Sequence, residues 1–369
     1  MALYRWDSGQ GAYRNLSTGA LLERFIAGVT EPQFDLTSMT GNVGNTPGVN
    51  LTTYAGTVTN GVAQLSAPLY ENILFPCVVD IRANTTLKNC RIVVPKTYTA
   101  SDSIAGVVRV LIGSGVTDVL LEDCEIHNRA QRPLNGIVGR NVTVRRSAIT
   151  GCVDGFSDST GGDSAMSYGF RIYDSIVADS AWWYTPTVNS IIHPSDTQSH
   201  GDGIQKGTTL TTTVENTVFA AYISELVGTG TAGSGSETNS YVPASGYNFI
   251  ATQAQMETWK NTFGNLATNP AVTRGGVARR LPSSGGSLAA AMVNREGVSF
   301  THCYFAGGIA TINLMDSNLP ASMNVTITNS KFWNDSKNGV AIQIATGKTA
   351  TLSGNTWAIG GGSVSPTYV

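Results

Sequence analysis

Three short motifs, each an Asn or Asp followed by a glycine and an apolar residue, are the first candidates for chemistry. They are Asn135-Gly136-Ile137, Asp154-Gly155-Phe156 and Asp202-Gly203-Ile204. If the motifs stack on neighbouring parallel strands, the carboxyl groups of Asp154 and Asp202 lie about 5 Å apart. Two like charges at that distance cannot both ionise without cost, so the pKa of one carboxyl should rise.

Two adjacent carboxyl groups with different pKa values are the acid and the nucleophile of a glycosidase, and a separation of about 5 Å fits the retaining mechanism. Asp154 and Asp202 are therefore candidate catalytic residues, with His200 as a proton shuttle or substrate contact. One alternative is that an Asn or Asp before glycine forms turns and hydrogen bonds along stacked strands. Another is that the column binds calcium through carboxylates and carbonyl oxygens.

Candidate substrate-binding residues surround this column. Asn135 belongs to the same column, while Asp158 and Lys206 each follow an aspartate of the column by four residues. A salt bridge between Asp158 and Lys206 is the favoured alternative to substrate binding.

A long excursion between two repeats, residues 178–200, adds further candidates. It contains the adjacent aromatic residues Trp182 and Trp183, together with His193. Adjacent aromatic side chains suit a sugar face or a neighbouring subunit, and burial against the protein itself is the alternative.

The elements that position these residues follow from a repeat. Eight copies share an apolar anchor, a turn residue two positions later, a small residue three later and an apolar residue five later. The anchors are Leu87, Leu121, Val144, Ile172, Val214, Phe300, Ile327 and Leu352. The turn column reads Asn, Asp, Arg, Asp, Asn, His, Asn, Gly. Apart from Arg146, these residue types tolerate a left-handed backbone, so each copy is predicted to be a strand, a tight bend and a second strand.

Successive anchors are 34, 23, 28, 42, 86, 27 and 25 residues apart. Periods of this size, with loops of variable length, are typical of a solenoid. The sequence therefore predicts an all-β protein, a parallel β-helix, and the preference for right-handed crossovers predicts a right-handed one. An antiparallel sandwich is the alternative, but its strands do not share a residue-by-residue template.

The same pattern divides the chain. Residues 1–75 are expected to form an N-terminal cap or adaptor, 76–227 the first coils, 228–297 a lateral insertion, and 298–369 the last coils and a tail. In the insertion, Thr252-Gln253-Ala254-Gln255 resembles a capping box, and Met256, Trp259, Phe263 and Leu266 then share one face of an expected helix.

Composition excludes several function classes. The 369 residues carry a formal net charge of −2, which disfavours nucleic acid or an anionic membrane surface as the main partner. No apolar run is long enough for membrane insertion, and the first residues lack a secretory signal peptide. Three of the five cysteines, Cys90, Cys124 and Cys303, occupy the small column, so we expect packing residues rather than disulfides or zinc ligands.

The repeated template, with examples such as Val325-Thr326-Ile327 before the bend, resembles the pectate-lyase-like right-handed parallel β-helix proteins. That superfamily includes pectate lyases, polygalacturonases and the tail spikes and minor tail proteins of bacteriophages. The segment from Ser199 to Gln205 is similar to segments of bacterial and phage β-helix proteins that carry acidic residues in carbohydrate-active members. The chain lacks the paired-aspartate and Arg-Ile-Lys signatures of polygalacturonases.

The resemblance implies a phage virion tail protein, acting outside the host cell, that binds host cell-wall polysaccharide and other phage tail proteins and assembles as a homotrimer. A polysaccharide-degrading glycosidase or lyase that uses the stacked carboxylates is the second hypothesis. A secreted structural or adhesive bacterial β-helix is the third.

Overall fold

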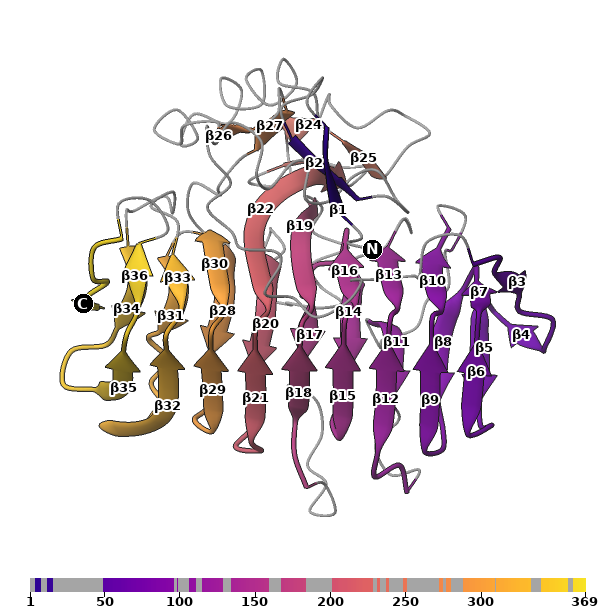
Figure 1. Ribbon diagram of the computed structural model, residues 1–369, viewed down its shortest axis with the longest axis horizontal. Helices are drawn as coiled ribbons and strands as arrows, with labels where there is room; N and C mark the ends of the chain where they lie inside the picture. Colours follow the sequence, from indigo (N-terminus) through magenta and orange to yellow (C-terminus); the bar gives the residue numbers. More distant parts are fainter. Residues whose placement is uncertain are drawn as a thin grey trace.

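The computed structural model describes residues 4–7, 12–15, 49–95, 98, 106–110, 115–128, 134–158, 167–183, 201–227, 231–232, 237–238, 248–250, 272–274, 277–279, 288–308, 310–332, 340–357 and 361–369. Three long β-sheets dominate these residues. The chain visits sheet 1, sheet 2 and sheet 3 in that order and then returns to sheet 1, one strand further along. The result is a row of stacked coils (Figure 1).

Each sheet receives one strand from every coil. Sheet 1 contains β4 (Val58–Thr59), β5 (Val62–Leu65), β8 (Val78–Ile81), β11 (Gly106–Val110), β14 (Asn135–Val138), β17 (Phe156–Ser157), β20 (Gly201–Lys206), β28 (Leu288–Val293), β31 (Ala310–Leu314), β34 (Val340–Ile344) and β37 (Thr367–Tyr368). Sheet 2 contains β6 (Leu69–Glu71), β9 (Thr85–Lys88), β12 (Val119–Glu122), β15 (Val142–Arg145), β18 (Phe170–Tyr173), β21 (Thr212–Glu215), β29 (Val298–Thr301), β32 (Ser322–Thr328) and β35 (Thr349–Ser353).

Sheet 3 contains β3 (Thr52–Thr53), β7 (Ile73–Phe75), β10 (Arg91–Val94), β13 (Glu125–Asn128), β16 (Ala148–Thr150), β19 (Ile176–Trp183), β22 (Val218–Val227), β30 (Tyr304–Gly307), β33 (Lys331–Phe332), β36 (Thr356–Trp357) and, beside β22, β25 (Asn248–Ile250). Neighbouring coils pair in parallel. The exceptions in the three sheets are β4 with β5 and β22 with β25, which pair antiparallel. The predicted parallel β-helix is therefore confirmed, and an antiparallel sandwich is excluded.

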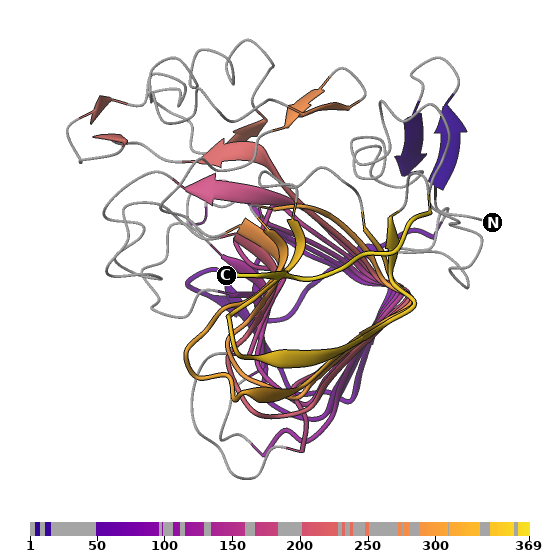
Figure 2. The same cartoon turned by 90° about the vertical axis from the view of Figure 1, so that its left-hand side faces the viewer.

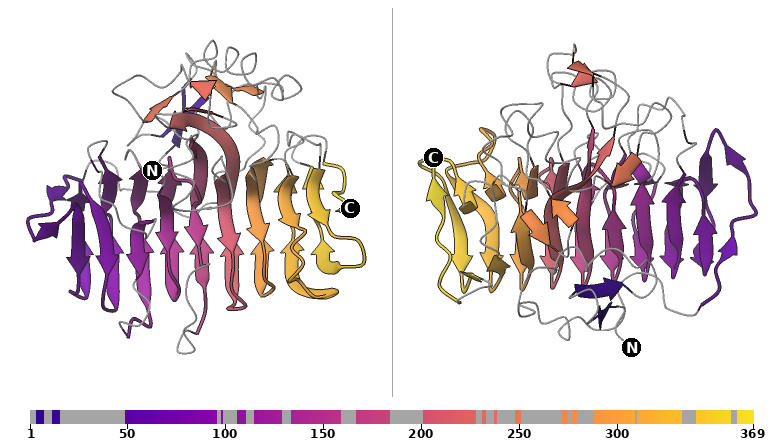
Figure 3. Two further views of the ribbon diagram at one scale, coloured as in Figure 1. Left: turned by 180° about the vertical axis from the view of Figure 1, so that it is seen from behind. Right: turned by 90° about the horizontal axis from the view of Figure 1, so that it is seen from above.

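Three antiparallel pairs lie outside these sheets. They are β1 (Tyr4–Asp7) with β2 (Ala12–Asn15), β23 (Thr231–Ala232) with β24 (Glu237–Thr238), and β26 (Val272–Arg274) with β27 (Val277–Arg279). Figure 3 shows these pairs beside the row of coils, in which the first coil (indigo) and the last coil (yellow) form the two ends. The helix expected at residues 252–266 lies outside the described residues.

The coils begin earlier in the chain than residue 76. Strands β5, β6 and β7 form a complete coil that pairs with the next one in all three sheets. Tyr70, Asn72 and Phe75 occupy the anchor, turn and second apolar columns of this coil, but Ile73 fills the column that is small elsewhere. This bulky residue explains why the first coil does not match the template.

The bend between sheet 2 and sheet 3 has the predicted left-handed backbone in every copy. All eight residues of the turn column have a positive φ, from 45° at Arg146 to 66° at Gly354, and Asn72 of the additional coil has a φ of 57°. Figure 2, which views the solenoid along its length, shows the coils superposed around this corner. A shared left-handed residue gives each coil the same change of direction.

The small column directly after the bend forms a hydrogen-bonded ladder inside the tube. The Cys124 N–H donates to Ser147 Oγ at 3.1 Å, and the Ser147 N–H donates to Ser175 Oγ at 3.2 Å. The five cysteines are free thiols and are buried. The cysteines of this column are packing residues, as the sequence predicts.

The core lies between the three sheets, where apolar side chains of neighbouring coils stack on one another. The anchors from Leu87 to Ile327 are fully buried. In sheet 3, Phe219, Phe305 and Phe332 stack with ring centroids 5.5 Å and 5.1 Å apart. Buried aromatic stacks of this kind fix the register between coils and give the solenoid a stiff wall.

Candidate functional site

The Asx-Gly-apolar motifs stack in register at the entry to sheet 1. Ile137 pairs with Phe156, and Phe156 pairs with Ile204, so Asn135, Asp154 and Asp202 form one column, as predicted. The structure places this column in the interior. Asp154 and Asp202 are 0% exposed, and Asn135 is 6% exposed.

Each member of the column accepts a hydrogen bond from the backbone of the next coil. The Asp154 N–H donates to Asn135 Oδ1 at 3.2 Å, the Asp202 N–H to Asp154 Oδ1 at 3.1 Å, and the Ala289 N–H to Asp202 Oδ1 at 2.9 Å. The residues therefore form a ladder that ties four coils together. This geometry supports the structural interpretation of the motifs.

Close contacts between neighbouring coils explain why glycine occupies the second position of each motif. A Cβ on Gly155 would lie 2.3 Å from Val177 Cγ1 and 2.5 Å from the Gly203 carbonyl oxygen. Gly136 and Gly203 face comparable contacts with the next coil and with sheet 3. Only glycine allows the coil to pass this close to its neighbours.

The second oxygens of the two carboxyl groups, Asp154 Oδ2 and Asp202 Oδ2, are buried and have no hydrogen-bond partner within the described part of the chain. Burial raises the pKa of Asp154 to about 7, although the Asp202 amide opposes the shift. Burial and the charge of Asp154 raise the pKa of Asp202 well above its ordinary value. The predicted rise is present, but a polysaccharide cannot reach either group from outside the tube.

Asp158 and Lys206 form the salt bridge that the sequence favours. Lys206 Nζ lies 3.2 Å from Asp158 Oδ2, and both side chains are 0% exposed. Like the column, this pair lies in the interior, at the end of sheet 1 where the chain leaves for sheet 2.

The remaining candidates are His193, His200, Trp182 and Trp183. His193 and His200 lie outside the described residues. Trp182 and Trp183 end the long strand β19, where their backbones pair with Leu226 and Val227 of β22. Within the described ranges, no group of three or more His, Cys, Asp or Glu residues is arranged to hold a metal ion.

An open groove on the outer side of the corner between sheet 2 and sheet 3 is the better candidate for a functional site. Its volume is about 720 Å³. It follows the turn column over five neighbouring coils, and its walls combine both charges, amides, an imidazole and two tyrosines. The lining residues are Arg145, Arg146, Tyr173, Asp174, Glu215, Asn216, His302, Tyr304, Asn329 and Lys331.

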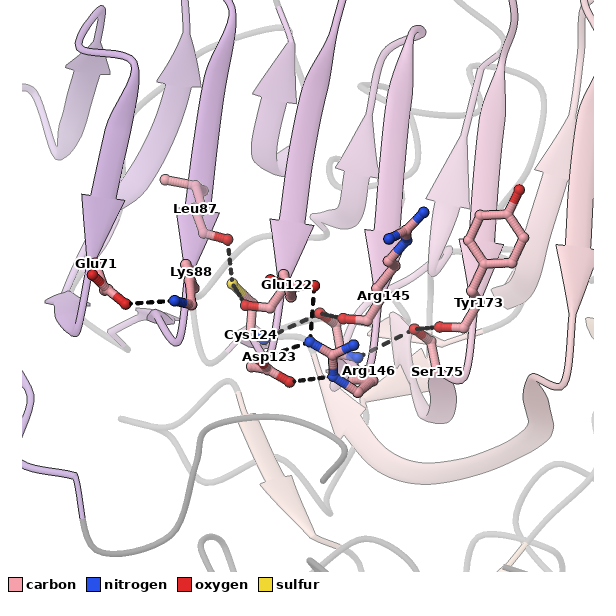
Figure 4. A network of polar contacts seen from close by, with 11 residues as sticks. Glu71, Leu87, Lys88, Glu122, Asp123, Cys124, Arg145, Arg146, Tyr173 and Ser175 are labelled. Atoms are coloured by element: carbon pink, nitrogen blue, oxygen red, sulfur yellow. Dashed lines mark hydrogen bonds and ion pairs between the residues drawn. The ribbon is translucent and has the colours of Figure 1, made fainter. Parts of the chain in front are cut away.

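A network of ion pairs lies at the N-terminal end of this corner groove, beside the first of its five coils (Figure 4). Arg146 has a left-handed φ of 45°, which is costly for a residue with a long side chain. Its guanidinium bonds Asp123 through Nε at 2.7 Å and Glu122 through Nη2 at 2.8 Å. These carboxylates raise the pKa of Arg146 further above its ordinary value. One coil further from the groove, Lys88 pairs with Glu71 at 2.9 Å.

Other charges in the groove are not committed to ion pairs. Arg145 lies over the ring of Tyr173, 5.5 Å from its centroid, and Lys331 lies over the ring of Tyr304 at 5.6 Å. Among the described residues, Arg145, Lys331 and Glu215 have no ion-pair partner. Charged groups beside tyrosine faces in an open groove are available to a polar ligand.

Sequence reasoning missed this groove. The repeat predicts only backbone bends at its turn residues, and its other members lie in or beside strands of several coils. The available signal was the mixture of Arg, Asp, Asn and His in the turn column, because a bend alone favours Asn or Gly.

The fold class is defined by the chain's own topology, three parallel sheets wound into a parallel β-helix. No protein-family model and no curated protein matches the sequence. Among solved structures, the chain is similar to pectate lyase Pel9A, with a TM-score of 0.34 and 12% sequence identity over 84% of this chain. The similarity spans 64% of the length of that pectate lyase. No described helix is long and apolar enough to cross a membrane.

Proposed function

We propose that this β-helix binds a glycan along the corner groove. The observation that carries the proposal is a groove in which Arg145, Lys331 and Glu215 have no ion-pair partner among the described residues, beside the faces of two tyrosines. Sugars combine hydroxyl groups with apolar ring faces, and polar side chains beside aromatic rings match both. Parallel strands hold these side chains at fixed spacings, so little conformational entropy is lost on binding.

The extent of the groove favours a linear ligand. Its residues come from five coils, which are stacked about 4.8 Å apart, so the groove extends for roughly 20 Å along the solenoid. A polymer that lies parallel to the solenoid axis would contact every coil in turn. Host cell-wall polysaccharide is the proposed ligand class.

A binding experiment tests the groove. Wild type, Tyr173→Ala and Lys331→Ala would be titrated calorimetrically with a panel of purified bacterial cell-wall polysaccharides. We expect each substitution to weaken binding about tenfold, the equivalent of about 1.4 kcal/mol, because each removes one cation and tyrosine pair. Tyr368→Ala is the control, since Tyr368 is 55% exposed in the last strand and outside the groove.

The possible outcomes distinguish the proposed binding site from the proposed binding activity. If both groove variants bind a polysaccharide as tightly as wild type, the ligand binds elsewhere. If wild type binds none of the host polymers, glycan binding itself is refuted. Circular dichroism of each variant shows whether the fold is retained.

We further propose a bacteriophage tail as the setting of this function. The support is the resemblance of the repeat to tail spikes and minor tail proteins, together with a rigid, charge-poor solenoid of 13% charged residues. In this setting the protein is a homotrimer in the virion and contacts other tail proteins. One chain has a mass of 38.8 kDa, and sedimentation equilibrium should give three times this value. A stable monomer that does not bind host cells would contradict the proposal.

Glycan cleavage is the second candidate, and one observation favours placing it in the groove. Glu215 has no ion-pair partner among the described residues, and His302 lies on the next coil, directly after Thr301, which pairs with Glu215. A carboxylate and an imidazole at one site can act as acid and base. Mass spectrometry of digested polysaccharide would decide. Cleavage lost in Glu215→Gln but retained in Asp154→Asn and Asp202→Asn supports the groove, and cleavage that persists in Glu215→Gln contradicts this role for Glu215.

A further inference from the structure

The interior ion pair of Asp158 and Lys206 joins two neighbouring coils at a place that solvent does not reach. Asp158 follows β17, and Lys206 is the last residue of β20, the adjacent strand of sheet 1. Both side chains are 0% exposed, and Lys206 Nζ lies 3.2 Å from Asp158 Oδ2. The amine is thus held against the Asp158 carboxyl group, so the two groups need not diffuse together before they react.

Burial makes this pair reactive as well as close. Removing an ammonium and a carboxylate from water is costly for each ion, and the attraction between them offsets this cost only in part. Burial is the main cause that lowers the pKa of Lys206, while Asp158 opposes the shift. Transfer of one proton from the amine to the carboxyl group gives a neutral pair, and a neutral amine is a nucleophile.

The neighbours of Asp158 supply the two other groups that such a reaction needs. The Gly207 N–H donates to Asp158 Oδ1 at 2.5 Å, so it can stabilise negative charge that develops on this oxygen. The Thr208 hydroxyl donates to Asp158 Oδ2 at 2.7 Å and also lies 3.3 Å from Lys206 Nζ. The hydroxyl therefore contacts both the amine and Oδ2, while Oδ1 is bonded by the Gly207 N–H.

We propose that Lys206 and Asp158 condense to an intramolecular isopeptide bond. The neutral amine attacks Cγ of the protonated carboxyl group, and the oxyanion forms on Oδ1, opposite the Gly207 N–H. An amine proton passes through the Thr208 hydroxyl to Oδ2. The Cγ–Oδ2 bond breaks, water leaves with both protons, and an amide joins Nζ to Cγ. No oxidant or other reactant is required.

The mass of the folded full-length chain tests this proposal directly. We expect wild type to be lighter than its sequence by one water molecule, and tandem mass spectrometry of a protease digest to show a branched peptide containing Asp158 and Lys206. The variants Lys206→Arg and Asp158→Ala should have the full masses of their sequences, since neither can form the amide.

The chain also contains a matched control pair. Lys88 and Glu71 are closer, at 2.9 Å, but their side chains are 46% and 40% exposed, so this pair should remain uncondensed. Water can also be lost from an Asp-Gly sequence as a cyclic imide, but that loss would persist in Lys206→Arg and give no branched peptide. A wild-type chain of full mass, or a loss that persists in Lys206→Arg, would overturn the proposal.

Discussion

For the residues of the interior column, the sequence predicts their stacking but not their burial. The sequence predicts correctly that Asn135, Asp154 and Asp202 stack, because the motifs share one spacing from their apolar strands. It does not predict that the column is fully buried. An Asp-Gly pair at a strand end can point to either side of a sheet, and the hydrogen bonds to the next coil decide the direction.

The buried carboxyl groups should make stability depend on pH. The pKa values of Asp154 and Asp202 are raised in the folded state, so the protonated forms stabilise the fold. This contribution is fully present below about pH 4, the ordinary pKa, and is lost as the pH rises toward and past the value of about 7 at Asp154. We expect the free energy of unfolding from urea titrations to fall by a few kcal/mol between pH 4 and pH 8.

Replacing the acids with their amides should remove this dependence. Asp154→Asn and Asp202→Asn keep the oxygen that accepts the backbone N–H but carry no charge, so the double variant should be at least as stable as wild type at pH 8. Asp316→Asn, at a partly exposed aspartate outside the column, is the control, and its stability should still fall between pH 4 and pH 8. A double variant with an unchanged profile would show that other groups cause the effect.

At the scale of the element, the repeated bend was the most predictable feature. Every residue of the turn column has the expected left-handed backbone, including Arg146, whose residue type does not favour it. The ion pairs of Arg146 with Asp123 and Glu122 explain this exception, and these contacts come from another coil. Such ion pairs depend on how neighbouring coils align, and this alignment cannot be deduced from one copy of the repeat.

The glycine column gives a prediction at the same scale. Gly155→Ala should lower the free energy of unfolding by about 3 kcal/mol, because the added methyl group overlaps Val177 and the Gly203 carbonyl oxygen. Gly362→Ala is the matched control, since a Cβ there would meet only Trp357 Cδ1, at 3.8 Å. Urea titrations of both variants would check the difference, and equal stabilities would show that the neighbouring coil can shift at little cost.

At the scale of the whole molecule, the sequence predicts the solenoid but not the corner groove. Apolar columns with a common spacing determine how the coils stack, and they can be counted in the chain. The corner groove depends on which outward side chains meet across five coils. Glu215 and His302 lie on neighbouring coils although they are 87 positions apart in the sequence, so no local pattern predicts their proximity.

The register across the longest interval between anchors has an evolutionary consequence. Strands β21 and β29 pair residue for residue, Val214 with Phe300, and the Ala289 N–H donates a hydrogen bond to Asp202 Oδ1, although a long segment lies between these coils in the sequence. The coil therefore closes independently of how much chain lies between sheet 3 and the next strand of sheet 1. Segments can be gained, lost or exchanged at that border while the corner between sheet 2 and sheet 3 keeps its geometry, so the molecule can acquire new attachments without changing the corner groove.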